Sequence, residues 1–275
     1  MQMNYLFTNS FFTGFIFTNS FFTGRSGSLK LSVLVCSAFT LGLLFSNSSN
    51  ADMVGEDEMK LDDIVQQALD VTPNLENGKG LFRNCAVCHS PEGWGTPNGR
   101  FPQIAGQHKS VIIKQLTDIH KGNRDNPTML PFTAPLIMLG AQALADISAY
   151  VSQLPMVPNN SIGYGAYLDE GKKLYDDNCK QCHESNGAGK AEKFYPRIHG
   201  QHYSYLERQL HWIKNGKRRN ADRKMVKQLQ KFNYREIEMI ADYVSRLRPE
   251  KSMLAESMYW KNPDFRTGFF TAPRD

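Results

Sequence analysis

The stretch "NCAVCHS", residues 84–90, returns as "NCKQCHE" at residues 178–184. Each stretch places two cysteines three positions apart, with a histidine directly after the second cysteine. On a helical turn, residues three and four apart share a face. Both copies therefore present two thiols and one imidazole towards a single object, and the residues concerned are Cys85, Cys88, His89, Cys179, Cys182 and His183.

The Cys-x-x-Cys-His spacing is the attachment pattern of haem c, in which the thiols bond to the two vinyl groups and the histidine becomes the proximal iron ligand. A zinc ribbon needs its second cysteine pair about 15–20 residues after the first, whereas these pairs lie 94 residues apart. A thioredoxin-type dithiol expects a preceding strand, and no β-branched apolar run precedes either motif. Disulfides stay open for either motif alone, but the repeated histidine would then be a coincidence. The sequence predicts two covalently attached haem c groups.

The repeat extends well beyond the cysteines. At the same offset of 94, "FPQIAGQHKS" at 101–110 pairs with "YPRIHGQHYS" at 195–204. Each copy ends in a segment with helical periodicity, at 141–154 and at 234–247. Further pairs at the offset of 94 are Gln115 with Gln209, Leu116 with Leu210, Ile119 with Ile213, Gly122 with Gly216, Arg124 with Arg218, and Asn126 with Asn220. A whole domain is therefore duplicated.

In each copy the order of parts is a short helix, Cys-x-x-Cys-His, a proline-containing loop, a helix, a methionine loop and a terminal helix. This order resembles a class I cytochrome c domain. The tandem copies, with "P-x-I-x-G-Q-H" and "R-x-N" in both, resemble the dihaem cytochrome c4 family over residues 75–250. The resemblance implies an all-α fold of two tandem class I cytochrome c domains, each with a covalently bound haem c. It also implies that the carbonyls of Pro102 and Pro196 accept hydrogen bonds from the proximal histidines.

The second axial ligand of each iron is predicted to be a methionine, the soft ligand that raises the reduction potential of cytochromes c. Met129 and Met225 hold equivalent positions after the Arg-x-Asn loops, where the resemblance places that ligand. Met138 has no counterpart, and Met239 lies in a helical apolar stripe, where methionine more often fills the core. The predicted iron ligands are therefore His89 and Met129 for one haem, and His183 and Met225 for the other.

The first 51 residues differ from the rest, because they contain no Asp or Glu and carry a basic flank before an apolar run. The run at 31–45 is shorter than the roughly 20 residues of a membrane-spanning helix. We interpret residues 1–51 as a secretory signal cleaved after about Ala51, which predicts a periplasmic protein. The perfect repeat "FTNSFFTG" at 7–14 and 17–24 precedes this signal, and we interpret it as a translated upstream repeat or a misplaced start.

The predicted domains are 52–155, which includes an N-terminal extension, and 156–250, followed by a tail at 251–275. In the extension, the amphipathic stretch "MKLDDIVQQAL" is expected to pack on the first domain. The tail is rich in aromatic residues, which either fold back onto the domains or bind another subunit. Peripheral association with a membrane complex is also compatible with it.

The two halves differ in charge. Split after Pro155, the first half of the mature chain has 8 basic and 12 acidic residues, and the second half has 22 basic and 15 acidic residues. Eight of the basic residues lie within 214–231, around Met225. A solvated face is the simple explanation, and nucleic acid is not expected to meet an exported protein. We instead expect an acidic redox partner to dock there, on Lys217, Arg218, Arg219 and Lys224.

These features favour an electron carrier rather than an enzyme, one that passes single electrons between a protein donor and a protein acceptor. An enzyme such as a dihaem peroxidase or a thiosulfate dehydrogenase would need an open sixth position at one haem. A third alternative is the electron-transfer subunit of a larger oxidoreductase complex.

Overall fold

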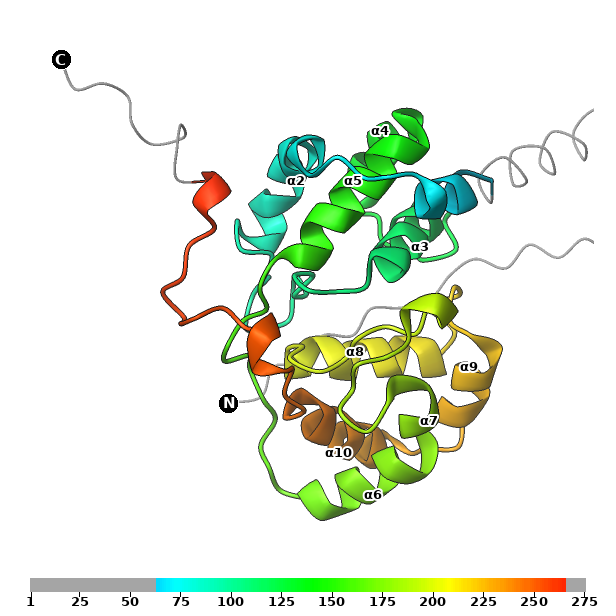
Figure 1. Ribbon diagram of the computed structural model, residues 1–275. Helices are drawn as coiled ribbons and strands as arrows, with labels where there is room; N and C mark the ends of the chain where they lie inside the picture. The colour runs from blue at the N-terminus through cyan, green and yellow to red at the C-terminus, as the bar shows by residue number, and fades with distance from the viewer. Residues whose placement is uncertain (1–62, 266–275) are drawn as a thin grey trace, which may run out of the picture. The chain divides into compact units, whose positions relative to one another are not determined.

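The computed structural model describes residues 63–265 (Figure 1). Within this range there are isolated β-bridges but no strands, which confirms the predicted all-α fold. Residues 63–70 are helical. The other helices of the first half are α2 (Leu75–His89), α3 (Lys109–His120), α4 (Leu130–Met138) and α5 (Gly140–Gln153). Those of the second half are α6 (Leu168–Asn178), α7 (Lys180–His183), α8 (Tyr203–Lys214), α9 (Arg223–Leu229) and α10 (Tyr234–Ser245), with 3₁₀ turns η1 (Ala191–Lys193), η2 (Lys251–Met253) and η3 (Pro263–Phe265).

In each half, the helix that leads into the cysteine motif crosses the last helix at a glycine. A Cβ atom on Gly78 of α2 would lie 2.2 Å from the carbonyl oxygen of Asp146 in α5. A Cβ atom on Gly171 of α6 would lie 2.4 Å from the carbonyl oxygen of Met239 in α10. Such distances leave no room for a side chain, so only glycine allows the two helices to approach this closely.

Replacing Gly78 by alanine is expected to destabilise the protein by about 1–3 kcal/mol, because the added methyl group meets backbone rather than a movable side chain. Gly80 provides the matched control on the same helix, since a Cβ atom there meets nothing within 4 Å. Gly80→Ala should stabilise the protein by roughly 0.5–1 kcal/mol through helix propensity. Guanidinium unfolding measures both changes, and equal effects at the two positions would contradict the proposed crossing.

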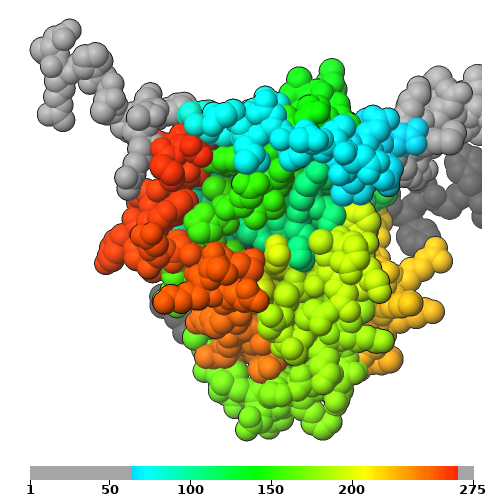
Figure 2. All heavy atoms as spheres, viewed as in Figure 1, coloured from blue at the N-terminus to red at the C-terminus, as the bar shows by residue number. Residues whose placement is uncertain are grey.

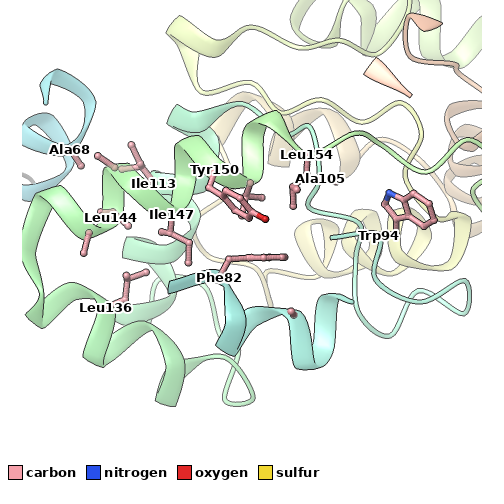
Figure 3. Packing of buried hydrophobic residues seen from close by; sticks show 14 of the residues in the cluster. Ala68, Phe82, Trp94, Ala105, Ile113, Leu136, Leu144, Ile147, Tyr150 and Leu154 are labelled. Atoms are coloured by element: carbon pink, nitrogen blue, oxygen red, sulfur yellow. The ribbon is translucent and has the colours of Figure 1, made fainter. Parts of the chain in front are cut away.

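Each half has its own apolar core, and each core contains a pair of aromatic residues at corresponding places in the fold. Phe82 packs against Tyr150 with ring centroids 5.5 Å apart, and Tyr175 packs against Tyr243 at the same distance. Figure 3 shows the first core, where Phe82 and Tyr150 lie between α2 and α5. The helical residues 63–70 add the fully buried Ala68 to this core, as expected of the amphipathic extension. The other largest fully buried apolar side chains are Ile113 and Leu144 in the first core, and Ile213, Ile237 and Ile240 in the second.

The helix that carries the cysteines is continuous in the first half and broken in the second. Phe82 lies three positions before Cys85, whereas Tyr175 lies four positions before Cys179. The aromatic residue is fixed by the core, so the second half must accommodate one extra residue. It does so at Cys179, where φ is −120° and which separates α6 from α7.

The chain after α10 runs back along the first half. We call residues 250–265 the C-terminal strap, and Figure 2 shows it against the first half of the chain. Its Asn262 donates a hydrogen bond to the carbonyl of Pro91 at 2.7 Å, and its Phe265 stacks edge-on against Phe82. Other contacts of the strap with the first half join Trp260 to Trp94, Asp264 to Tyr150 and Lys79, and Lys261 to Glu92. The described part of the predicted tail therefore folds back onto the domains.

The predicted leader at 1–51 and the last ten residues of the tail lie outside the described residues. Within residues 63–265, no helix combines the length and the apolar character needed to cross a membrane.

Candidate functional site

The two Cys-x-x-Cys-His motifs end their helices in the same way. His89 is the last residue of α2 and His183 the last of α7. The residues that follow, Ser90 and Glu184, have φ values of 65° and 64°, a region that few residues other than glycine adopt. The chain therefore turns away directly after each histidine, and both histidines are buried.

The four cysteines of the motifs are half-buried and form no disulfide in the described structure. Burial raises the pKa of Cys85 to about 11 and the pKa of Cys179 to about 12. A redox-active dithiol has the opposite property, a lowered thiol pKa that provides the reactive thiolate. The environment of the motifs thus differs from that of a thioredoxin-type site.

Both histidines are held in one orientation by a proline carbonyl. The Nδ1–H of His89 donates to the carbonyl of Pro102 at 2.9 Å, and that of His183 donates to the carbonyl of Pro196 at 3.1 Å. These are the carbonyl partners implied by the family resemblance. Burial lowers the pKa of both histidines, which favours the neutral imidazole. With Nδ1 protonated, the lone pair is on Nε2, the state required of a metal ligand.

One continuous cavity of about 940 Å³ joins the two motifs. The apolar walls come from both halves and include Ile112, Leu116 and Val151 from the first half and Leu206, Leu210 and Val244 from the second. Both cysteine pairs and both histidines lie on its surface. An apolar cavity with a few converging polar groups is the usual form of a cofactor site.

The lining of the cavity distinguishes the two methionines that are predicted to bind iron from the two other candidates. Met129 and Met225 line it, so each half contributes a thioether as well as an imidazole and two thiols. Met138 does not line it and is 87% exposed, and Met239 lies on α10 outside its lining. Met129 directly precedes α4, and its N–H donates to the carbonyl of Asn126 at 3.0 Å. Met225 lies in the first turn of α9, which Asp222 caps with its side chain.

This donor set fits haem c. Two thiols could form thioether bonds, the imidazole nitrogen and the methionine sulfur could bind iron, and the apolar walls could cover a porphyrin. Within the described residues no group of three or more His, Cys, Asp and Glu side chains is arranged to hold a bare metal ion.

Two arginines from equivalent positions of the repeat meet at the cavity. Arg124 donates to Tyr205 of the other half at 2.7 Å, and Arg218 donates to Gln115 of the other half at 3.2 Å. Gln209 accepts from both guanidinium groups. Burial lowers the pKa of Arg218 to about 9, with a further contribution from the charge of Arg124. Positive charges that converge on an apolar cavity suit a cofactor that carries carboxylate groups, and haem is such a cofactor.

The position of Arg218 corrects one prediction. We expected it on an exposed docking surface, but its guanidinium bonds Gln115, Gln209 and Asn220 where the two halves meet. The other three predicted docking residues, Lys217, Arg219 and Lys224, are exposed. The run of basic residues led to the prediction that Arg218 lies on a docking surface. The pairing of Arg218 with Arg124 at the offset of 94 is also visible in the sequence and gives the contrary signal.

Comparison with known proteins identifies the family. The cytochrome c family model matches residues 75–155 and 168–248. Cytochrome c4 of Pseudomonas aeruginosa is 33% identical over 178 residues, which cover 62% of this chain and 87% of that protein. The chain belongs to the cytochrome c4 family.

Two further relatives of this cytochrome c4-family chain are informative. The crystal structure of reduced recombinant cytochrome c4 from Pseudomonas stutzeri matches with a TM-score of 0.55 and 31% identity, over 64% of this chain and 100% of that one. A thiosulfate dehydrogenase electron acceptor of Stutzerimonas stutzeri is 27% identical and is matched over 59% of this chain and 78% of that protein. As a member of the cytochrome c4 family, the chain carries two covalently bound haem c groups and transfers electrons.

Proposed function

We propose that this protein is a periplasmic dihaem electron carrier whose two haems are each ligated by one histidine and one methionine. The observation that carries the proposal is the doubled donor set around one cavity: two thiols, an imidazole and a thioether from each half. When bound, each haem iron exchanges one electron as it changes between the ferrous and ferric states.

The proposed roles follow the equivalent positions of the repeat. Cys85 and Cys88 attach one haem and Cys179 and Cys182 the other, through thioether bonds. The Nε2 atoms of the buried histidines and the sulfur atoms of the cavity methionines complete the coordination, with His89 and Met129 on one iron and His183 and Met225 on the other. The proposed domains are 52–155 and 156–250, after removal of a leader that ends at about Ala51.

Ligation by methionine at both irons supports a carrier rather than an enzyme. A catalytic haem needs an open or labile position for its substrate, whereas a protein thioether closes that position. The test is an anaerobic spectroelectrochemical titration of the wild-type protein, followed by addition of carbon monoxide to the reduced form. We expect two one-electron steps, the spectral signature of methionine ligation at both haems and no carbon monoxide binding. Tight binding at one haem would contradict the proposal and favour a catalytic dihaem protein.

The family relative that accepts electrons from thiosulfate dehydrogenase suggests the kind of donor. We propose that an oxidoreductase delivers electrons to this protein one at a time and that a second redox protein removes them. A carrier with two haems and one shared cavity is suited to this role, because its two halves offer different surfaces to the two partners.

The basic surface of the second half is the proposed docking site for a partner with an acidic surface. Its exposed charges are Lys217, Arg219 and Lys224, and Lys224 lies beside Met225 at the edge of the cavity. The ammonium of Lys217 lies 4.4 Å from the ring centroid of Trp212, and Arg219 donates to the carbonyl of Gly122. These contacts orient the charges without removing them from solvent.

Replacing Lys217, Arg219 and Lys224 together by glutamine is expected to slow electron exchange with the acidic partner about 10-fold or more at low salt, since steering by charge raises association rates by roughly 10–10³. The dependence of the rate on ionic strength should flatten at the same time. The matched control replaces three exposed lysines that do not line the cavity, Lys172, Lys173 and Lys251, with the same change in net charge. Stopped-flow kinetics that respond equally to both triple variants would argue against a local docking site.

A further inference from the structure

The motif P-x-I-x-G-Q-H contains a glutamine and a histidine in each copy that the proposed haem ligation does not use. These residues are Gln107 and His108 in the first half and Gln201 and His202 in the second. Besides hydrogen bonds within their own half, such as the one that the Nδ1 of His202 accepts from the N–H of Ser161 at 3.2 Å, their side chains reach the opposite half. All four of them make hydrogen bonds to the backbone of the opposite half.

Each glutamine binds both backbone polar groups of a single residue in the opposite half. The Oε1 of Gln107 accepts from the N–H of Arg197 at 2.9 Å, and its Nε2 donates to the carbonyl of Arg197 at 2.9 Å. The Oε1 of Gln201 accepts from the N–H of Gln103 at 3.1 Å, and its Nε2 donates to the carbonyl of Gln103 at 2.8 Å. Arg197 and Gln103 directly follow the two prolines whose carbonyls orient the proximal histidines.

Each histidine of the motif binds a second segment of the opposite half. The Nε2–H of His108 donates to the carbonyl of Ala188 at 2.9 Å, and that of His202 donates to the carbonyl of Trp94 at 2.8 Å. The two acceptors are equivalent positions of the repeat. The contacts between the halves therefore follow a pseudo-twofold pattern, in which each copy makes the same bonds to the other.

The residues after these two acceptors are glycines that pack directly on the proline carbonyls. A Cβ atom on Gly95 would lie 2.4 Å from the carbonyl oxygen of Pro102, and one on Gly189 would lie 2.5 Å from that of Pro196. Each proline carbonyl is thus enclosed by two segments, the one that contains the glycine and the one that follows the proline. Both segments are tied to the opposite half, by a histidine and a glutamine respectively.

We infer that each half of the protein fixes the proximal histidine of the other half. The positioning residues and the histidines they serve are Gln107 and His108 for His183, and Gln201 and His202 for His89. This inference rests on the proposed ligation of iron by the two proximal histidines. The bond from Nδ1–H to a carbonyl raises the basicity of a metal-bound imidazole, so the position of that carbonyl tunes the metal.

The reduction potential of each haem is then set in part by residues of the other half of the chain. Loss of the glutamine amide removes both hydrogen bonds to the backbone of the residue after the proline. We expect this loss to loosen that segment and weaken the bond between the carbonyl and Nδ1–H. The imidazole then donates less charge to iron, the ferric state is less stabilised, and the reduction potential rises. The Nδ1–H proton should also exchange faster with solvent.

The experiment replaces Gln107 and Gln201 separately by methionine in the full haem-loaded protein. The midpoint potential of each haem is measured by spectroelectrochemical titration, and the Nδ1–H exchange of each proximal histidine is measured by NMR. Each haem is identified by assigned resonances of its own half. Gln107→Met is expected to raise the potential of the second haem and speed exchange at His183, with smaller changes at the first haem. Gln201→Met is expected to give the reverse pattern.

Ser110 provides the control, because it makes a hydrogen bond between the halves that does not reach either proline. Its Oγ donates to the carbonyl of Ala191 at 2.6 Å. Ser110→Ala should leave both potentials and both exchange rates unchanged. If methionine at position 107 separates the halves, Gln107→Glu keeps an acceptor for the N–H of Arg197 and replaces the donor by a charged carboxylate oxygen. The same crossed comparison is made with it.

Shifts confined to the haem of the mutated half, or no shift at either haem while the halves stay associated, would overturn the inference. Failure of the proposed function gives a different result, because the wild-type titration would then lack methionine ligation at one or both haems before any variant is considered.

Discussion

Replacing Cys179 and Cys182 together by alanine is expected to give a protein with one haem instead of two and with an unfolded second half. A chain that cannot attach the second haem would have to leave its part of the cavity filled by water or collapse it. At about 24 cal/mol for each Å³, even half of the 940 Å³ corresponds to on the order of 10 kcal/mol. This is comparable with the whole folding free energy of a domain, about 5–15 kcal/mol.

The equivalent change in the first half, at Cys85 and Cys88, is expected to be less severe. The first core is supported by residues 63–70 on one side and by the C-terminal strap on the other, and Phe265 of the strap packs on Phe82 itself. The second core consists of fewer buried apolar residues, and its cysteine-bearing helix is broken at Cys179. The two double variants therefore provide an internal comparison of how far each half depends on its haem.

Intact mass measures the loss of covalently bound haem, and far-UV circular dichroism measures the loss of helical structure. Limited proteolysis shows which half has unfolded. Gln181→Ala is the matched control, because Gln181 is an exposed residue between the same two cysteines and its replacement leaves the motif intact. It should retain two haems. A double cysteine variant that keeps two covalently bound haems would show that another residue makes the attachment.

The sequence predicts well which residues of the two copies are equivalent, and it predicts poorly which residues of one copy contact the other. The offset of 94 pairs Pro102 with Pro196 and His108 with His202, and the structure gives the members of each pair the same type of partner. However, an internal repeat says only which residues occupy the same place in each copy. It does not say that the glutamine of one copy binds the backbone of the other, because that depends on how two complete domains pack.

Single-residue differences between the copies were also beyond prediction. The extra residue between Tyr175 and Cys179 is visible in the sequence, yet only the position of Tyr175 in a packed core forces the helix to break there. Whether the tail packs on its own chain or on a partner could not be predicted, for a similar reason. Its aromatic residues suit either a partner or the chain itself, and the fold selects the chain because Trp94 and Phe82 provide surfaces for them.

The methionines provide the second large effect. Met129→Ala and Met225→Ala are each expected to lower the potential of one haem on the order of 0.1 V or more, within the about 0.8 V that axial ligation spans. The reason is that a thioether stabilises ferrous iron, whereas water, which would replace it, does so less well. Each variant should also bind carbon monoxide at one haem and lose half of the methionine-ligation signal in the spectroelectrochemical titration.

Met138→Ala and Met239→Ala are the matched controls, because each removes a thioether of the same half that does not line the cavity. Both should keep two low-spin haems with unchanged potentials. If instead Met129→Ala excludes carbon monoxide and keeps its potential, another side chain is the ligand of that iron. The comparison between halves is equally informative, since Met129 directly precedes its helix while Met225 lies inside the first turn of its own. We expect Met225→Ala to disturb the fold more, because it also removes an apolar side chain that packs on the smaller second core.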